Sequence, residues 1–118
     1  MTPEEFVTIQ KEVCQKYGAE YAPVAWDQTA GVARNLVATT EHVNGLRHPP
    51  VDQTCGWHIW AGELSPDPDF FQPLHVAHFI QQAPHILKYL ALGPGWRFLI
   101  AEGHEDVWFY ATLLDVSS

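Results

Sequence analysis

The sequence predicts a small α+β domain, in which an antiparallel sheet of about four to five strands packs against an N-terminal helix and a proline-broken helix pair. Three observations lead to this fold class. The N-terminal residues have helical periodicity, later segments have strand length and composition, and 118 residues suffice for one hydrophobic core. The apolar fraction of 47% is typical of a globular protein. We therefore expect a single domain over residues 1–118.

The spacing of apolar residues predicts a helix over residues 3–17. Thr2 can act as N-cap, Pro3 suits the first helical position, and Glu5 completes a capping box. Gly18 stands where a left-handed C-terminal cap is expected. One apolar face is formed by Phe6, Ile9, Val13, Cys14 and Tyr17.

Strands are expected near residues 33–43, 57–61, 96–101 and 107–110. Asn44-Gly45 is the favoured dipeptide of a tight hairpin, and the alternative is a bulge with the strand continuing to Arg47. In the strand 57–61, alternation places Trp57 and Ile59 on one side of the sheet and His58 and Trp60 on the other.

The helix pair is expected at residues 74–82 and 84–90, because Pro84 suits the first position of a second short helix. Gly93-Pro94-Gly95 then ends it. The run from Gly62 to Pro73 predicts a long loop that Phe70-Phe71 anchors to the core.

Charge and cysteine content narrow the classes of partner. The net charge of −8 and the scattered lysines and arginines argue against nucleic acid and against an anionic membrane surface. They favour a basic protein partner, although the same acidity would also serve solubility alone. Cys14 is expected as a buried thiol, which fits a reducing compartment, and the N-terminus lacks the features of a signal peptide. A cytoplasmic location is therefore predicted.

The sequence contains few features of a catalytic site or of a metal site. His75 and His78 are three residues apart on a predicted helix, and His85 could add a third ligand, but no motif supplies a fourth. There is no G-x-S-x-G element, and Gly93-Pro94-Gly95 lacks the features of a phosphate-binding loop. We expect no catalytic residues, metal or cofactor.

Carboxylates on two loops are the better candidates for function. The first group is the acidic loop, residues 63–69, with Glu63, Asp67 and Asp69; the second lies at a hairpin tip, with Glu102, Glu105 and Asp106. Loops stiffened by proline lose little entropy on binding, which favours recognition of a basic partner. A solvated loop without a partner is the alternative. Trp60 is a further candidate, as a binding anchor if its face of the sheet is uncovered and as core if it is covered.

The segment 56–99 combines, in this order, Gly56-Trp57, Gly62-Glu63, Leu74, the run from Pro84 to Leu90, and Gly95-Trp96-Arg97-Phe98. In this order of features it resembles the Imm33-like immunity-protein domain. With an upstream strand near 33–37, the resemblance covers about residues 32–110 and leaves the N-terminal helix outside. It implies a bacterial protein that binds a toxin, and it brings no catalytic residues with it.

The leading hypothesis is a protein that neutralises a toxin by masking basic residues of its surface, without turnover. The alternative is a small-molecule-binding or enzymatic domain with a pocket near Trp57, His58, Trp60 and His75. A third possibility is a structural homodimer through a sheet edge or through the Trp60 face, so monomer and homodimer both remain open.

Overall fold

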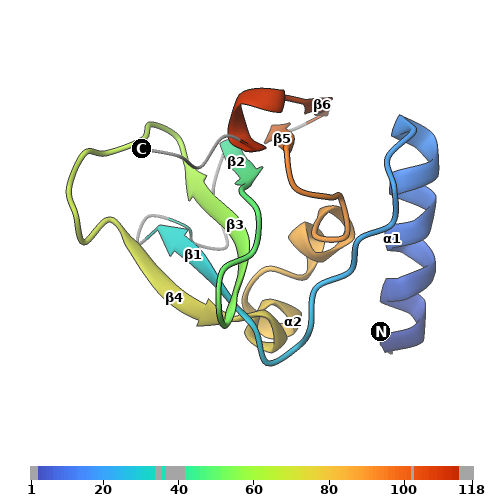
Figure 1. The fold of residues 1–118 in the computed structure, drawn as a ribbon, viewed down its shortest axis with the longest axis horizontal. Coiled ribbons are helices and arrows are strands. Elements are labelled where there is room, and N and C mark those ends of the chain that lie inside the picture. The colour runs from blue at the N-terminus through green and yellow to red at the C-terminus, as the bar shows by residue number, and fades with distance from the viewer. Residues whose placement is uncertain (1–2, 34–35, 37–41, 102, 115–118) are drawn as a thin grey trace.

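The computed structural model describes residues 3–33, 36, 42–101 and 103–114 (Figure 1). The strands form one layer, and helical segments, among them 3₁₀ helices (η), cover one of its faces. In chain order the elements are α1 (Pro3–Tyr17), β1 (Thr29–Ala33), β2 (His42–Arg47), β3 (Thr54–Ala61), β4 (Phe71–His75), η1 (Val76–His78), α2 (Phe79–Gln82), η2 (Pro84–Tyr89), β5 (Trp96–Ala101), β6 (His104–Phe109) and η3 (Ala111–Leu114).

Helix α1 has the predicted bounds and the predicted C-terminal cap. Gly18 has φ +71°, its N–H donates to the Gln15 carbonyl, and the Ala19 N–H donates to the Cys14 carbonyl, which together form a Schellman motif. The expected N-cap, Thr2, lies outside the described residues. No helix in the described part of the chain is long and apolar enough to cross a membrane.

The sheet is mixed and has six strands in the order β4-β1-β3-β2-β5-β6. The expectation of a purely antiparallel sheet of four to five strands was therefore wrong in two respects. β1 and β3 run parallel, since the chain between them makes an extra strand, β2, that pairs on the far side of β3. Of the predicted strand 33–43, Ala33 belongs to β1, His42 and Val43 belong to β2, and residues 34, 35 and 37–41 lie outside the described residues.

The hairpin predicted at Asn44-Gly45 was also wrong. Both residues lie inside β2, which continues to Arg47 as the alternative predicted, but β2 pairs in unbroken register with β3 and with β5, so there is no bulge at these two residues. The glycine has a packing reason: a Cβ atom at Gly45 would lie 2.2 Å from the Phe98 ring. Phe98 lies across β2 at this point, and only glycine leaves room for it.

The helix pair begins later than predicted. Residues 71–75, which include the expected helix start at Leu74, form β4 instead, and 3₁₀ and α-helical turns follow from Val76. Pro73 is tolerated in this strand because β4 is at the edge of the sheet, where a strand can do without one N–H donor. The second helix of the predicted pair is present as η2.

The hydrophobic core lies between one face of the sheet, the inner face, and the helical segments. Trp57, Ile59 and Phe98 from the sheet meet Phe79, Ile86, Leu87 and Leu90 from the helical layer, all fully buried. In Figure 1, η2 lies between α1 and the sheet, so α1 forms an outermost layer. The prediction that Trp57 and Ile59 share one side of the sheet is confirmed, and that side is the one that faces the core. The opposite face, the outer face, carries His58 and Trp60.

A buried arginine ties three segments to this core. Arg47 is 3% exposed, and its guanidinium donates to the carbonyls of Ala22, Cys55 and Leu92 at 2.7–2.9 Å. Burial lowers its pKa from the usual value. Since no carboxylate in the described part of the chain pairs with it, the three carbonyl dipoles hold the charge.

Candidate protein-binding surface

The acidic loop is held in one shape by its own hydrogen bonds. The Asp67 N–H donates to Ser65 Oγ at 3.1 Å, and the Asp69 N–H donates to Asp67 Oδ1 at 2.9 Å. The Phe70 N–H donates to the Asp67 carbonyl at 3.0 Å. With Pro66 and Pro68 restricting the backbone between them, the loop is organised before any partner arrives.

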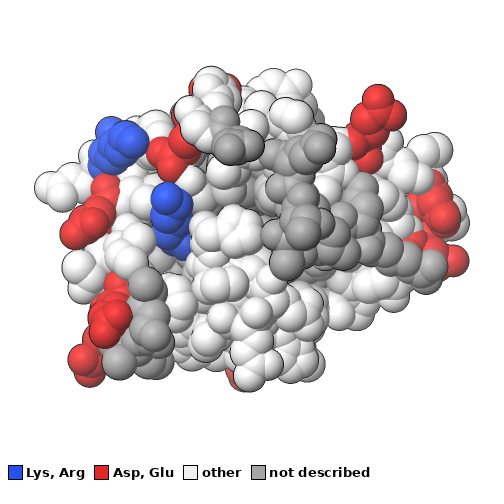
Figure 2. Space-filling model, turned by 180° about the vertical axis from the view of Figure 1, so that it is seen from behind, with Lys and Arg blue, Asp and Glu red and all other residues white. Residues whose placement is uncertain are grey.

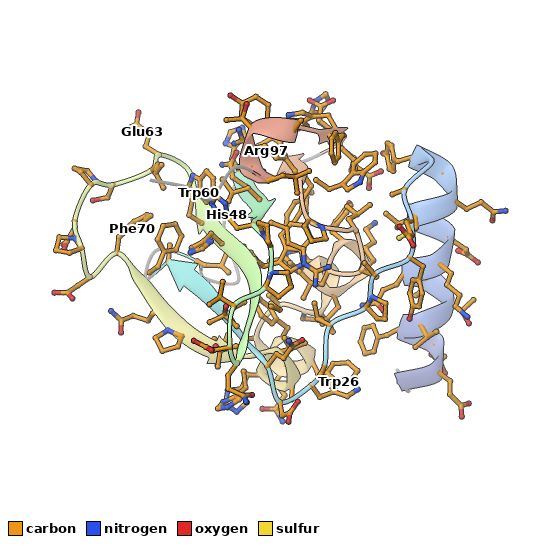
Figure 3. The ribbon with its side chains drawn as sticks, in the orientation of Figure 1. Trp26, His48, Trp60, Glu63, Phe70 and Arg97 are labelled. Carbon is orange, nitrogen blue, oxygen red and sulfur yellow. The ribbon has the colours of Figure 1, made fainter. Side chains whose placement is uncertain are left out.

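The three carboxylates of this loop are exposed and uncompensated. Glu63, Asp67 and Asp69 form no ion pair within the described part of the chain. The loop projects at one end of the molecule, and Figure 2 shows acidic side chains without basic ones at this end, whereas the other end carries acidic and basic side chains together. In Figure 3, Glu63 points away from the molecule. This end therefore presents negative charge to solvent.

The second acidic group does not form one tip. Glu102 lies outside the described residues, whereas Glu105 and Asp106 belong to β6. Asp106 is exposed, and its Oδ2 atom lies 2.8 Å from His104 Nε2. The sequence placed these carboxylates on a loop because the strand 107–110 was expected to start three residues later than it does.

Glu105 serves an internal role. Its carboxylate accepts hydrogen bonds from the hydroxyls of Tyr17 and Tyr89, and it pairs with Lys16 at 3.2 Å and Lys88 at 3.7 Å. Partial burial alone would raise its pKa, but the bonds from Tyr17, Tyr89 and Lys16 outweigh this and hold the pKa at about 2. Glu105 thus fastens α1 and η2 to the edge of the sheet.

Trp60 is placed on the outer face, as alternation predicted, but it is only 5% exposed. Its ring meets Phe71 edge to face, with centroids 6.1 Å apart, and Phe71 in turn meets His58 at 5.1 Å. The aromatic pair therefore anchors the loop to the outer face through Phe71, and the expectation that it reaches the core was wrong, because neither ring belongs to the core cluster. In this conformation Trp60 forms the floor of a surface feature and does not project from it.

That feature is a hollow of about 190 Å³ on the outer face, which we call the outer hollow. Figure 3 shows Trp60 and His48 beside β3, below the acidic loop. The hollow is lined by Leu46, His48, His58, Trp60, Leu64 and Phe71. Leu46, His48, Leu64 and Phe71 were not singled out as site residues from the sequence; the one available signal was Leu64, an apolar residue alone among acidic and proline positions.

A second hollow, of about 290 Å³, lies where β1 and β3 lose register. Thr29 pairs with Thr54, but Gly31 pairs with His58, so β3 contains more residues than β1 between these two pairs. Gly56 (φ +93°) absorbs the bulge, and a Cβ there would lie 2.0 Å from the His48 carbonyl oxygen. Trp57, His58 and Phe71 are among its lining residues.

His58 separates the two hollows. Burial, with a smaller contribution from neighbouring His48, lowers its pKa, so the ring is neutral at pH 7. Its Nδ1 atom is buried and has no hydrogen-bond partner in the described part of the chain. Of the four residues in the pocket hypothesis, Trp57, His58 and Trp60 line these hollows, and His75 does not.

The three histidines considered as metal ligands are not brought together. The His75 and His78 rings lie 5.8 Å apart, centroid to centroid, whereas His85 lines a separate small recess with Phe79 and Ala83. Within residues 3–33, 36, 42–101 and 103–114, no group of three or more His, Cys, Asp or Glu could hold a metal ion.

The far edge of the sheet carries an aromatic group that the sequence analysis left unassigned. The Arg97 guanidinium lies over Trp108 at 5.2 Å and over Tyr110 at 5.8 Å from the ring centroids. Trp108 is 37% and Phe109 48% exposed, so this edge combines aromatic surface with a cation. This edge also carries the carboxylates of Glu105 and Asp106, so it presents charges of both signs, whereas residues 63–69 contain acidic residues only.

Comparison with known proteins identifies the family. The family model described as the Imm33-like domain matches residues 9–110. The match begins inside α1 and so reaches further toward the N-terminus than the segment that carried the resemblance. No curated protein and no solved structure matches the chain. The match covers most of the sequence, and the chain belongs to the Imm33-like domain family.

Proposed function

We propose that this protein is an immunity-type binding protein that neutralises a cognate toxin by covering basic residues on its surface. The observation that carries the proposal is the acidic loop, whose three exposed carboxylates lack internal cations and whose backbone is already ordered. Exposed charge of one sign accelerates encounter with a partner of the opposite sign. Membership of a family named for immunity proteins supports a protein as the partner.

Within this proposal Glu63, Asp67 and Asp69 make the first contact, and Asp106 adds charge at the other edge. Glu105 contributes to stability and is no longer proposed as a partner-binding residue, because its carboxylate already accepts hydrogen bonds from Tyr17 and Tyr89. Trp60 supports the surface from below. We also propose a cytoplasmic location. It fits Cys14 and Cys55, which are both free and buried, and burial raises the pKa of both thiols.

The test compares two baits of equal charge in affinity capture from the native organism. One carries Asp67→Asn with Asp69→Asn in the acidic loop, and the control carries Glu12→Gln with Glu20→Gln at exposed positions elsewhere. For the captured protein, the loop variant is expected to lower the association rate constant about tenfold at low salt and to flatten its salt dependence. Equal association rates for the two baits would remove the loop from the interface.

Neutralisation is then tested by producing the captured protein in a host with each variant. Growth is expected to be rescued by the wild type and by the control, and to a lesser degree by the loop variant. A captured protein that is harmless to the host would contradict the immunity role.

A small-molecule site is the second candidate, favoured by the two hollows that meet at His58. Both volumes fall below the roughly 300–1,000 Å³ typical of sites for drug-sized ligands. A shift in melting temperature with a metabolite library, abolished by His58→Ala, would support this candidate, and the absence of any shift would oppose it.

A further inference from the structure

The outer hollow and the acidic loop are parts of one surface. Leu64 belongs to both, since it lines the hollow and follows Glu63 in the loop. Its side chain is 59% exposed, so the apolar rim of the hollow is open to solvent beside a carboxylate. An apolar recess bordered by negative charge combines two kinds of recognition at one place.

The shape of the hollow is fixed by ring packing. Trp60 and His58 each meet Phe71, and His58 meets His48, with centroid distances between 5.1 and 6.1 Å. These rings come from β3, from β4 and from the residue after β2, so the recess is built on the sheet and not on a loop alone. Rigid, partly buried aromatic surfaces are where binding energy concentrates in protein interfaces.

The size of the hollow selects its occupant. At about 190 Å³ it is smaller than sites for whole cofactors or drug-sized ligands, but it suits a single bulky side chain. Its lining is two aliphatic side chains and four rings, and the buried one of its two histidines, His58, is neutral at pH 7. An apolar side chain therefore fits the lining, whereas a charged one would lose its hydration without gaining a partner.

The charge at the rim selects what flanks that side chain. Glu63 lies next to Leu64, and Asp67 and Asp69 lie further along the same loop. A side chain in the hollow contacts Leu64 of this loop, so lysine or arginine beside the inserted residue would be attracted, and aspartate or glutamate would be repelled.

We infer that the outer hollow receives one bulky apolar side chain from a basic segment of the partner protein, with neighbouring lysine or arginine residues paired to the acidic loop. This inference rests on the proposed function and specifies the epitope: an apolar anchor flanked by cations. In this inference the acidic loop and the outer hollow have different roles: the loop sets the association rate, and the hollow sets the lifetime of the complex.

Short synthetic peptides test the hollow without any toxin. The probes are the blocked tripeptides Lys-Phe-Lys, Lys-Ser-Lys and Glu-Phe-Glu, titrated into labelled protein while the NMR signals of Trp60, His58 and Leu64 are followed. We expect Lys-Phe-Lys to shift these signals, with Kd about tenfold lower than for Lys-Ser-Lys, and Glu-Phe-Glu to leave them in place. Equal Kd values for the two lysine peptides, or no shift with Lys-Phe-Lys up to its solubility limit, would overturn the inference.

The captured partner supplies the second test. Leu64→Ser removes the rim of the hollow, and Val51→Ser is the matched control, since Val51 is 60% exposed and lies outside the hollow. We expect Leu64→Ser to raise the dissociation rate constant about tenfold with the association rate unchanged, and Val51→Ser to change neither. Both positions are exposed, so the melting temperature should stay at the wild-type value.

The outcomes separate the two proposals. If the partner binds and is neutralised but Leu64→Ser dissociates no faster than Val51→Ser, the hollow is not the anchor site and the proposed function stands. If the captured protein proves harmless while Lys-Phe-Lys still binds selectively, the hollow is a peptide site and the immunity role fails.

Discussion

Replacing Glu105 with Gln should lower the free energy of unfolding by about 3 kcal/mol at pH 7, because a fall in pKa from 4.5 to about 2 corresponds to that energy. The carboxylate is 24% exposed, so solvent screens it only in part. Most of the effect should come from Tyr17 and Tyr89, since Lys16 and Lys88 are 65% and 40% exposed and such surface pairs contribute little. Gln keeps the size of the side chain and removes its charge.

The dependence on pH distinguishes this account from simple loss of packing. A lowered carboxyl pKa means that the folded state binds fewer protons than the unfolded state between about pH 4.5 and 2. The contribution of Glu105 is therefore full above pH 4.5 and disappears as the pH falls through this window. The difference between wild type and Glu105→Gln should shrink in the same way.

Urea unfolding followed by tryptophan fluorescence at several pH values measures both effects. Asp106→Asn is the matched control, because Asp106 is the next residue along β6, is 54% exposed and, among the residues that the structure describes, pairs with exposed His104 alone. We expect it to change stability by less than about 1 kcal/mol. If Glu105→Gln unfolds at the same urea concentration as Asp106→Asn, or if its deficit is as large at pH 2 as at pH 7, the argument is refuted.

Two further predictions concern the core. Gly45→Ala should destabilise the fold by about 3 kcal/mol because its Cβ would lie 2.2 Å from the Phe98 ring, whereas Gly93→Ala, whose nearest neighbour would be 3.7 Å away, should be nearly neutral in melting temperature. Equal melting temperatures would contradict the packing argument. Arg47→Met should cost about 3 kcal/mol by leaving three carbonyls without their donor, and Arg47→Lys should restore only part of this in urea unfolding. Full recovery with Lys would show that charge alone matters.

Local signals in the sequence predicted the elements that depend on local interactions. The helix α1 and its cap follow from periodicity and from Gly18, and β5 follows from a strand-length apolar run after a glycine-proline break. The second half of the helix pair follows from Pro84. In each case the residues that decide the structure are neighbours in the chain.

The sheet topology could not be predicted because its determinants are distant in sequence. Asn44-Gly45 has the composition of a turn, yet Gly45 is inside a strand, where it leaves room for the ring of Phe98, more than fifty residues later in the sequence. Pro73 argued against a strand, but an edge position removes that objection, and nothing local reveals which strand is at the edge. The parallel pairing of β1 with β3 depends on the same global arrangement.

In the candidate surface, too, the features with local determinants could be predicted and those that depend on distant residues could not. The acidic loop was visible as composition, and its carboxylates are where exposure allows them to act. The outer hollow was not visible, because Leu46, His48, His58 and Phe71 come together only when β2, β3 and β4 are placed in one sheet. The burial of Trp60 and the engagement of Glu105 likewise depend on partners from other elements.

The position of Arg47 and Glu105 on the inner side has a consequence for how this surface can change. The side chains that tie the layers together, and the core they enclose, lie away from the acidic loop and the rim of the outer hollow. Substitutions at Glu63, Leu64, Asp67 or Asp69 therefore alter exposed atoms and leave the contacts of the core and between the layers in place. Such a scaffold can acquire a new binding specificity in single steps, each of which still yields a folded protein.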